Sequence, residues 1–204
     1  MAKLYYKFGA MGSSKTAQAL MTKFNYEEKL KRVWLIKPAT DNRDDYVDGN
    51  GKTIGVVRSR IGLLSEAEII SAEDNVRDIF LKRNNEANID VIICDECQFL
   101  SEKQVEDLKD ICDELDVPVL CFGLRADFQT KMFPGSKRLF EIADSISEIK
   151  SICRCGRKAT VNVRFDDDGN IITEGDQICI GGNDRYEGMC YKCYRTLYKE
   201  RLGF

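Results

Sequence analysis

A glycine-rich octapeptide near the start of the chain has the residue types and spacing that bind phosphate. It consists of Gly9, Ala10, Met11, Gly12, Ser13, Ser14, Lys15 and Thr16. The pattern G-x-x-x-x-G-K-[ST] is matched except at Ser14, where glycine is expected. In such a loop the backbone N–H groups form a nest for phosphate, Lys15 adds a cation, and the Thr16 hydroxyl joins a Mg²⁺ shell. The alternative interpretation is a plain Gly/Ser-rich connector before an exposed helical turn.

Two acidic residues, Asp95 and Glu96, directly follow an apolar run at 91–94. Ligands of open α/β sheets bind at the carboxyl ends of such buried strands. Asp95 is therefore placed to hold Mg²⁺, directly or through water, and Glu96 to accept a proton from an attacking nucleophile. The alternative is a pair of turn acids without a chemical role.

Two cysteine pairs, Cys153 with Cys155 and Cys190 with Cys193, enclose a short segment near the C-terminus. Four thiolates satisfy tetrahedral Zn²⁺, and a zinc site would supply folding energy that the thin core of this segment lacks. The first pair has the tighter spacing C-x-C, which makes Cys155 the weakest ligand assignment. Chance cysteines or a redox pair are the alternatives. The other cysteines are expected mainly in the core: Cys94, Cys97, Cys112, Cys121 and Cys179.

The composition excludes several classes of chemistry. The 204 residues include no histidine, so catalytic triads, Cys-His dyads and imidazole metal ligands are impossible. With 31 Lys+Arg against 34 Asp+Glu, the net charge of -3 argues against a dedicated nucleic-acid binder. No apolar run is long enough to span a membrane, and the first residues lack the apolar core of a signal peptide. The odd number of cysteines, nine, fits a reducing compartment, and we expect a cytoplasmic protein.

Strand and helix signals alternate over the first 150 residues, which predicts crossover units and a parallel sheet with helices on both faces. Strands are predicted at 4–8, 33–36, 53–58, 91–94 and 117–124. Helices are predicted at 17–24, 71–82 and 101–115, the last two opened by Ser71 and Ser101 as N-caps. The fold class is therefore α/β.

The sequence changes character after residue 150. A strong turn signal at 166–170 lies between segments 160–165 and 171–173, which predicts a small β-rich module. We therefore expect two domains, an α/β nucleotide-binding domain at 1–150 and a zinc-binding module at 151–204.

The ordered combination of motifs resembles the type II thymidine kinases, the zinc-containing group found in bacteria and in animal cytosol. The resemblance covers nearly the whole chain and rests on the phosphate loop, the cysteine pairs, and segments 37–43, 59–62, 95–99, 123–129 and 180–186. Three positions depart from the family pattern: Ser14, Cys97 where glycine is frequent, and the C-x-C spacing.

The resemblance implies a P-loop, RecA-like parallel sheet flanked by helices, with a small zinc-ribbon-like β domain. It implies transfer of the γ-phosphoryl group of ATP to the 5′-hydroxyl of thymidine, giving dTMP for pyrimidine salvage and DNA synthesis. Mg²⁺ would accompany ATP and Zn²⁺ would be structural. The family also implies a homotetramer, and dTTP is a candidate feedback inhibitor.

The resemblance also implies roles for individual residues. Glu96 would be the general base, with Lys15 and Arg60 beside the transferred phosphate. ATP and Mg²⁺ would contact residues 9–16 of the phosphate loop and Asp95, Glu96, Cys97 and Gln98. The nucleoside pocket would comprise Met11, Leu124, Phe128, Phe133 and Tyr186, and a lasso loop formed by Ile178, Cys179, Ile180, Gly181 and Gly182. For the aromatic residues, ordinary core packing is the alternative.

Two other functions remain open at this point. The acidic box also resembles that of helicases, so one rival is a nucleic-acid-dependent P-loop ATPase with a zinc ribbon. It is disfavoured because 204 residues leave no room for a second motor domain and the net charge is acidic. The other rival is a non-catalytic zinc-ribbon adaptor that binds nucleotide only for stability.

Overall fold

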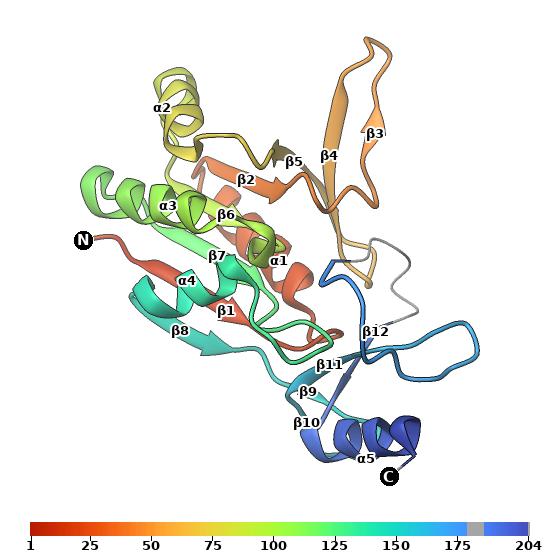
Figure 1. The fold of residues 1–204 in the computed structure, drawn as a ribbon. Coiled ribbons are helices and arrows are strands. Elements are labelled where there is room, and N and C mark those ends of the chain that lie inside the picture. Colours follow the sequence, from red (N-terminus) through yellow and green to blue (C-terminus); the bar gives the residue numbers. More distant parts are fainter. Residues whose placement is uncertain (179–185, 204) are drawn as a thin grey trace.

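Eight strands form one central sheet in the computed structural model, which describes residues 1–178 and 186–203 (Figure 1). The order across the sheet is β3-β4-β5-β2-β6-β7-β1-β8. Their bounds are β1 Leu4–Phe8, β2 Val33–Pro38, β3 Tyr46–Val47, β4 Thr53–Arg58, β5 Leu64–Ile70, β6 Val91–Cys94, β7 Val119–Gly123 and β8 Ser145–Glu148. The strands from β5 to β8 run parallel, and β3 and β4 add an antiparallel edge.

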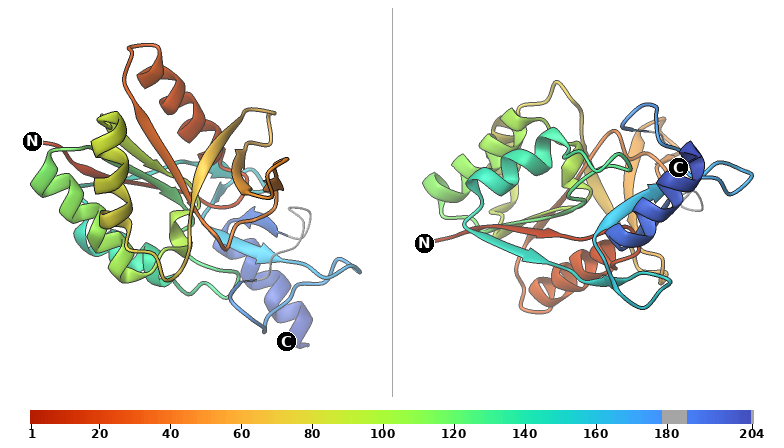
Figure 2. Two further views of the ribbon diagram at one scale, coloured as in Figure 1. Left: turned by 90° about the horizontal axis from the view of Figure 1, so that it is seen from above. Right: turned by 60° about the horizontal axis from the view of Figure 1, so that its bottom comes forward.

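Helices cover both faces of the sheet because successive residues of its central strands are apolar. Helix α1 (Lys15–Glu27) lies on one face, and α2 (Val76–Ala87), α3 (Glu102–Leu115) and α4 (Pro134–Ile142) lie on the other (Figure 2). In β6, Ile92 belongs to the core under α2 to α4, whereas Ile93 belongs to the core under α1. Strands buried on both faces are typical of parallel α/β sheets. The predicted fold class is confirmed.

The N-cap of α2 lies four residues after the predicted one. Asn75, not Ser71, is the N-cap, and its side chain accepts a hydrogen bond from the Asp78 N–H. Ser71 and Asp74 instead close a separate turn, in which the Ser71 N–H donates to the Asp74 carboxylate. The capping box predicted at Ser101 is confirmed at the start of α3. An Asn side chain caps as well as a Ser one, so the pattern alone did not decide between them.

Several elements were not predicted, among them β5, α4 and β8. Strand β5 pairs with β2, although its sequence contains two glutamates. One of them, Glu68, accepts a hydrogen bond from the Trp34 indole at 2.7 Å. The polar residues of β5 are thus paired at the edge of the apolar core, a contact between distant parts of the chain that local patterns do not reveal.

The C-terminal part, which we call the C-terminal module (residues 151–178 and 186–203), contains four short strands and one helix. These are β9 Ser151–Ile152, β10 Lys158–Ala159, β11 Val161–Arg164, β12 Tyr186–Met189 and α5 Tyr191–Leu202. Its small core includes Val163, Ile171, Met189 and Tyr194. Across residues 1–178 and 186–203, no helix is long and apolar enough to cross a membrane.

Of the two segments beside the predicted turn, only 160–165 contains a strand, β11. The turn at 166–170 forms, with the Asp166 carboxylate accepting backbone N–H groups of Asp168 and Asn170. However, Phe165 and Ile171 make only an isolated bridge, and the strand partner of β11 is β12. The polar residues after Ile172 offer little to pack beside β11, whereas Met189 of β12 enters the module's core.

Candidate active site

The phosphate loop lies between β1 and α1, as predicted, and its backbone is sharply turned. A Cβ atom on Gly9 would stand 2.3 Å from the Ser13 hydroxyl and 2.6 Å from the Ile149 carbonyl oxygen, so only glycine fits. Gly12 has a φ of 73°. Ser14, the N-cap of α1, is also left-handed, with φ 61° and ψ 27°. This explains physically why glycine is expected at position 14.

Lys15 is buried over the loop that it belongs to. Its side chain donates to the Ala10 carbonyl oxygen at 3.0 Å and approaches the Ser13 hydroxyl at 3.4 Å. Burial lowers the pKa of Lys15, while the charges of Glu96 and Asp95 act against that shift. The acidic pair therefore supports the cation that a phosphate group would meet.

Asp95 directly follows the buried strand β6 and has one unsatisfied carboxylate oxygen. Among the described residues, Oδ1 is buried and has no hydrogen-bond partner. Burial, and then the charge of Glu96, raise the pKa of Asp95 to about 7, although a hydrogen bond with the Thr16 side chain lowers it. A free carboxylate oxygen beside a hydroxyl is the oxygen donor set that Mg²⁺ prefers. Asp95 and Thr16 therefore fit a magnesium site.

The Glu96 carboxylate is held on both of its oxygens. Oε1 accepts from the Arg43 guanidinium at 3.1 Å, and Oε2 accepts from the Gln98 side-chain amide. The side-chain oxygen of Gln98, Oε1, in turn accepts a hydrogen bond from the Leu124 N–H at 2.9 Å. Gln98 is almost completely buried and Cys97 completely so, so these two side chains lie behind the acidic pair. Glu96 is thereby fixed in orientation.

Arg43 is a residue whose role the sequence did not indicate. Its Nε donates to the Asp41 carboxylate at 2.6 Å in addition to the Glu96 contact. Burial works against its charge, but the hydrogen bonds and charges of Asp41 and Glu96 outweigh burial and raise the pKa of Arg43. The only signal in the sequence was the family-like segment 37–43, which contains Arg43.

The two halves of the predicted site converge on one cleft. Its lining comprises residues 11–17 of the phosphate loop, Arg43, Glu96 and residues 58–61, which include Arg60. The Arg60 guanidinium lies 4.0 Å from the position that a Cβ atom on Gly12 would take. Lys15 and Glu96 therefore line the same cleft, at the edge of the sheet where β1 and β6 end.

The residues assigned to a nucleoside pocket are only partly brought together. Met11 and Tyr186 line a neighbouring cleft. Leu124, Phe128 and Phe133 are buried, and the Phe133 ring packs edge-on against Phe99. Ile178 is exposed, and Cys179, Ile180, Gly181 and Gly182 lie outside the described residues. Arg164, which the sequence did not single out, places its guanidinium over the rings of Phe128 at 5.4 Å and Tyr186 at 5.9 Å.

The C-terminal module sits directly on the phosphate loop. Asn162 of β11 accepts the Met11 N–H at 2.8 Å and donates to the Ala126 carbonyl oxygen at 2.7 Å. A Cβ atom on Gly188 of β12 would stand 2.6 Å from the Met11 carbonyl oxygen, so this close approach requires glycine. Neither residue had a recognisable signal in the sequence, because the contact joins segments about 150 residues apart.

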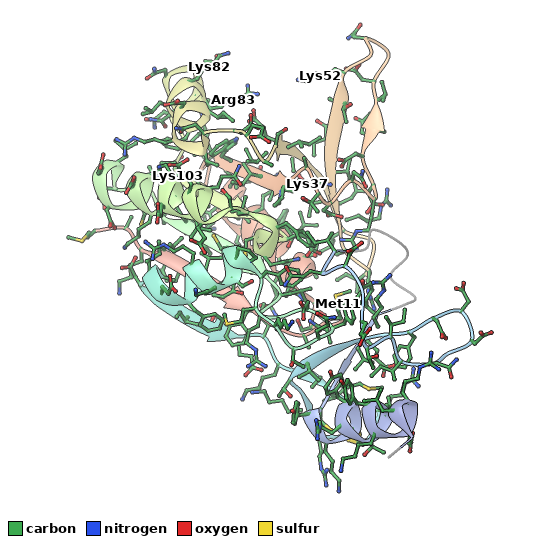
Figure 3. All side chains as sticks on the ribbon, in the orientation of Figure 1. Met11, Lys37, Lys52, Lys82, Arg83 and Lys103 are labelled. Carbon is green, nitrogen blue, oxygen red and sulfur yellow. The ribbon has the colours of Figure 1, made fainter. Side chains whose placement is uncertain are left out.

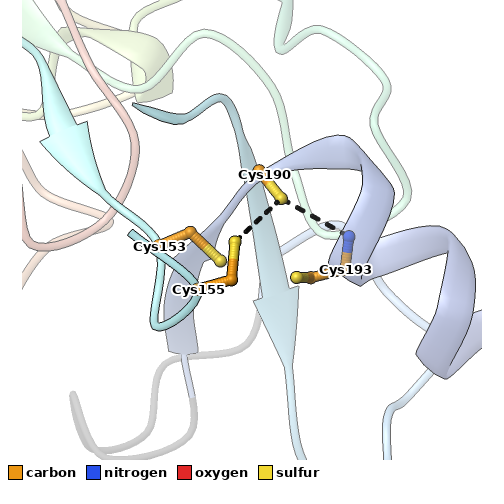
Figure 4. Close-up of side chains that lie close together, drawn as sticks. All are labelled: Cys153, Cys155, Cys190 and Cys193. Atoms are coloured by element: carbon orange, nitrogen blue, oxygen red, sulfur yellow. Dashed lines mark hydrogen bonds between the residues drawn. The ribbon is translucent and has the colours of Figure 1, made fainter. Parts of the chain in front are cut away.

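Four cysteines form a compact thiol cluster in the C-terminal module (Figure 4). The sulfur atoms of Cys153, Cys155, Cys190 and Cys193 all lie within 4.8 Å of one another, and the Cys155 and Cys190 sulfurs are 3.6 Å apart. Two thiolates on tetrahedral zinc with Zn–S near 2.3 Å would be about 3.8 Å apart. The cluster therefore fits structural zinc, and the C-x-C spacing brings Cys155 into it.

The electrostatics of this cluster also favour a cation. The Cys193 N–H donates to the Cys190 sulfur and lowers the pKa of Cys190 to about 7. The neighbouring thiols raise the pKa of Cys193 to about 12. Coupled thiols behave in this way because they cannot all ionise together without a compensating charge. The remaining described cysteines Cys94, Cys97, Cys112 and Cys121 are buried, as predicted, and Cys179 lies outside the described residues.

This fold and site define a P-loop α/β protein with a carboxylate positioned beside the phosphate loop. A family profile described as thymidine kinase matches residues 2–194. A thymidine kinase of Vibrio vulnificus strain YJ016 is 43% identical over 203 residues, covering 100% of both chains. Those of Shewanella oneidensis and Yersinia pestis are 42% and 39% identical, covering 96% and 98% of this chain and 97% of each relative. The chain belongs to the thymidine kinase family.

The left-handed conformation of Ser14 predicts that Ser14→Gly stabilises the protein. A non-glycine residue in this region costs roughly 1–2 kcal/mol, of which the greater chain entropy of glycine returns about 0.5–1. We expect a net gain of about 0.5–1 kcal/mol, or a Tm about 2 °C higher, by differential scanning calorimetry. Ser65→Gly in β5 is the matched control and should lower Tm. A Tm unchanged or lowered by Ser14→Gly would contradict the argument.

The raised pKa of Asp95 predicts a stability that depends on pH in the absence of divalent cations. Because its pKa is about 7 when folded and about 3.8 when unfolded, keeping Asp95 ionised costs stability above pH 7. Asp95→Asn should therefore raise Tm at pH 8 in EDTA, and the gain should vanish as the pH falls from 7 towards 4. Asp90→Asn should lower Tm at pH 8, because the Arg32 N–H lowers the pKa of Asp90. A less stable Asp95→Asn variant at pH 8 would refute this account.

Proposed function

We propose that this chain transfers the γ-phosphoryl group of ATP to the 5′-hydroxyl of thymidine, giving dTMP. The observation that carries the proposal is the shared cleft of Lys15 and Glu96, with the Glu96 carboxylate fixed by Arg43 and Gln98. The family assignment and the relatives named thymidine kinase support the same activity. A phosphoryl transfer requires mainly alignment and charge neutralisation, and this cleft offers groups for both.

The residues of the cleft divide the work of the transfer. The backbone N–H groups of the phosphate loop and Lys15 bind the triphosphate, and Arg60 contacts its terminal end. Glu96 accepts the proton of the 5′-hydroxyl as the new O–P bond forms and the bond between the γ-phosphorus and ADP breaks. Asp95 and Thr16 would hold Mg²⁺, which supplies charge neutralisation on the β- and γ-phosphates when bound. Cys97 and Gln98 support this edge from behind.

The nucleoside is proposed to lie on the module side of the cleft. Met11, Leu124, Phe128, Phe133 and Tyr186 would enclose it, with main-chain groups of residues 178–182 on the base. Support comes from Met11 and Tyr186, which line one cleft, and Met11 itself belongs to the phosphate loop. The half-buried Arg164, whose guanidinium lies over the rings of Phe128 and Tyr186, adds a polar group to an otherwise apolar wall.

The organisation of the chain is also a proposal. We propose an α/β nucleotide-binding domain at 1–150, a zinc-binding module at 151–204, and a cytoplasmic homotetramer that dTTP inhibits. Exposed apolar side chains on and after α1 support an oligomer: Met21, Phe24 and Leu30 are 54%, 60% and 93% exposed. Inhibition by dTTP follows from its chemistry, because it carries both the thymidine moiety and a triphosphate. The family assignment does not favour the nucleic-acid-dependent ATPase.

Glu96→Gln tests the catalytic role directly. The substitution keeps the shape of the side chain but removes its basicity, so thymidine phosphorylation should fall by about 10²–10⁴-fold while binding of a non-hydrolysable ATP analogue is retained. Radiolabelled dTMP formation and calorimetric titration measure the two properties. Glu106→Gln on the surface of α3 is the matched control and should leave turnover unchanged.

Two outcomes of this experiment would favour the rival functions. Unaltered properties of Glu96→Gln would support a non-catalytic adaptor. ADP release by the wild-type protein that requires single-stranded DNA and ignores thymidine would support a motor ATPase.

Zinc binding can be tested by substituting Cys155, the predicted ligand with the least usual spacing. We expect one zinc ion per chain by mass spectrometry of the metal, and Cys155→Ser should lose it as completely as Cys193→Ser because all four sulfurs form one cluster. Tm should fall in both variants, since the metal stabilises a module with a small core. Cys112→Ser, which alters a buried thiol outside the cluster, should retain zinc. Full zinc occupancy in Cys155→Ser would rule out Cys155 as a ligand.

A further inference from the structure

Lys37 is a completely buried lysine that the proposed chemistry does not use. It is the penultimate residue of β2, and its relative exposure is 0% (Figure 3). Burying an ammonium group without partners is costly, so such a residue needs close compensating groups. The partners of Lys37 therefore indicate what it holds in place.

These partners belong to the two segments that follow β2. The ammonium group lies 2.6 Å from the Asp45 carboxylate, 3.0 Å from the Val56 carbonyl oxygen and 3.8 Å from the Asp41 carboxylate. The same Asp45 oxygen also accepts the Val56 N–H at 2.9 Å. Lys37 thus attaches the loop 39–45 to the end of the sheet at two carboxylates.

The loop 39–45 connects this buried charge to the proposed general base. Asp41 accepts from Arg43 Nε at 2.6 Å through its other oxygen, and Arg43 donates to Glu96 at 3.1 Å. Positive and negative charges alternate along this series from Lys37 to Glu96. The Asp41 and Glu96 side chains are only 11% and 15% exposed, so solvent and salt screen these interactions less than surface pairs.

We propose that Lys37 is a positioning residue that keeps the Arg43 guanidinium on Glu96. Without the ammonium group, Asp41 and Asp45 would face each other across a buried site with Arg43 as the nearest remaining cation of the series. Arg43 would then be drawn towards these two carboxylates and away from Glu96. The inference rests on the proposed function only in that it takes Glu96 as the base.

A double-mutant cycle tests whether Lys37 acts through Arg43. Lys37→Met should lower kcat for thymidine about 10–100-fold, with the KM for thymidine and the affinity for an ATP analogue nearly unchanged. In an Arg43→Gln background, the same substitution should change kcat less than twofold. Lys31→Met is the matched control, because Lys31 pairs with Asp90 at the exposed opposite end of β2 and should affect neither background.

A lysine that only stabilises the fold would give a different result. Lys37→Met would then lower Tm and leave kcat per folded molecule unchanged, or reduce kcat equally in both backgrounds, and either outcome overturns the proposal. If Lys37→Met does not fold, Asp45→Asn takes its place in the cycle, with a smaller loss of kcat expected and again no further loss with Arg43→Gln.

A second readout is independent of turnover. The NMR signal of the Arg43 Nε–H, identified by its loss in Arg43→Gln, should shift in Lys37→Met and stay in place in Lys31→Met. An unmoved signal would refute the positioning role even if the wild-type protein phosphorylated thymidine. Conversely, a wild-type protein without thymidine kinase activity would refute the proposed function, while the shift would still report the Lys37–Arg43 coupling.

Discussion

Electrostatic repulsion between neighbouring carboxylates is the constraint around which this active edge is built. Asp95 and Glu96 follow each other at the end of a buried strand, and burial together with the charge of Glu96 raises the pKa of Asp95. Such an arrangement persists only when cations lie close by. The charge of Lys15 interacts with both acids, and the Arg43 guanidinium contacts Glu96 directly, so the pair has two positive neighbours. The unsatisfied oxygen of Asp95 leaves room for a further cation, and Mg²⁺ with its nucleotide fits that role.

Support for this edge comes from two separate parts of the molecule. The sheet side supplies Arg43 and Gln98, both of which hold Glu96. The C-terminal module supplies Asn162 and Gly188, which contact Met11 of the phosphate loop and neither of the two acids. The orientation of Glu96 and the position of Met11 are therefore held by different parts of the molecule.

The sequence predicted those features of the site that depend on local order and missed those that depend on tertiary contact. The phosphate loop and the acidic pair are short motifs whose geometry is set by neighbours in the chain, and both lie where expected. The cysteine cluster joins two such short motifs, 35 residues apart at Cys155 and Cys190, and the four ligands of tetrahedral zinc indicated that they meet. Arg43 and Asn162 act through residues 53 and 151 positions away, respectively. For Asn162 the sequence carried no signal, and for Arg43 it carried only the resemblance of segment 37–43 to the family. The same reason accounts for β5, whose glutamates obscured a strand that pairs with β2. Helix α2 shows the limit of local patterns themselves, because Ser71 and Asn75 were both acceptable caps.

Because the sheet and the C-terminal module hold different parts of the cleft, a loosening of the module affects one part and not the other. Loosening of the C-terminal module would first release Met11, whose N–H and carbonyl oxygen both contact it. Glu96 would keep its orientation, since Arg43 and Gln98, which bind its carboxylate, belong to the segments after β2 and β6. Under the proposed placement of the nucleoside beside Met11, the energetic cost of admitting it falls on the module and not on the proposed base. A structural metal in the module would then set how firmly Met11 is held, and it would do so without touching the groups that move the proton.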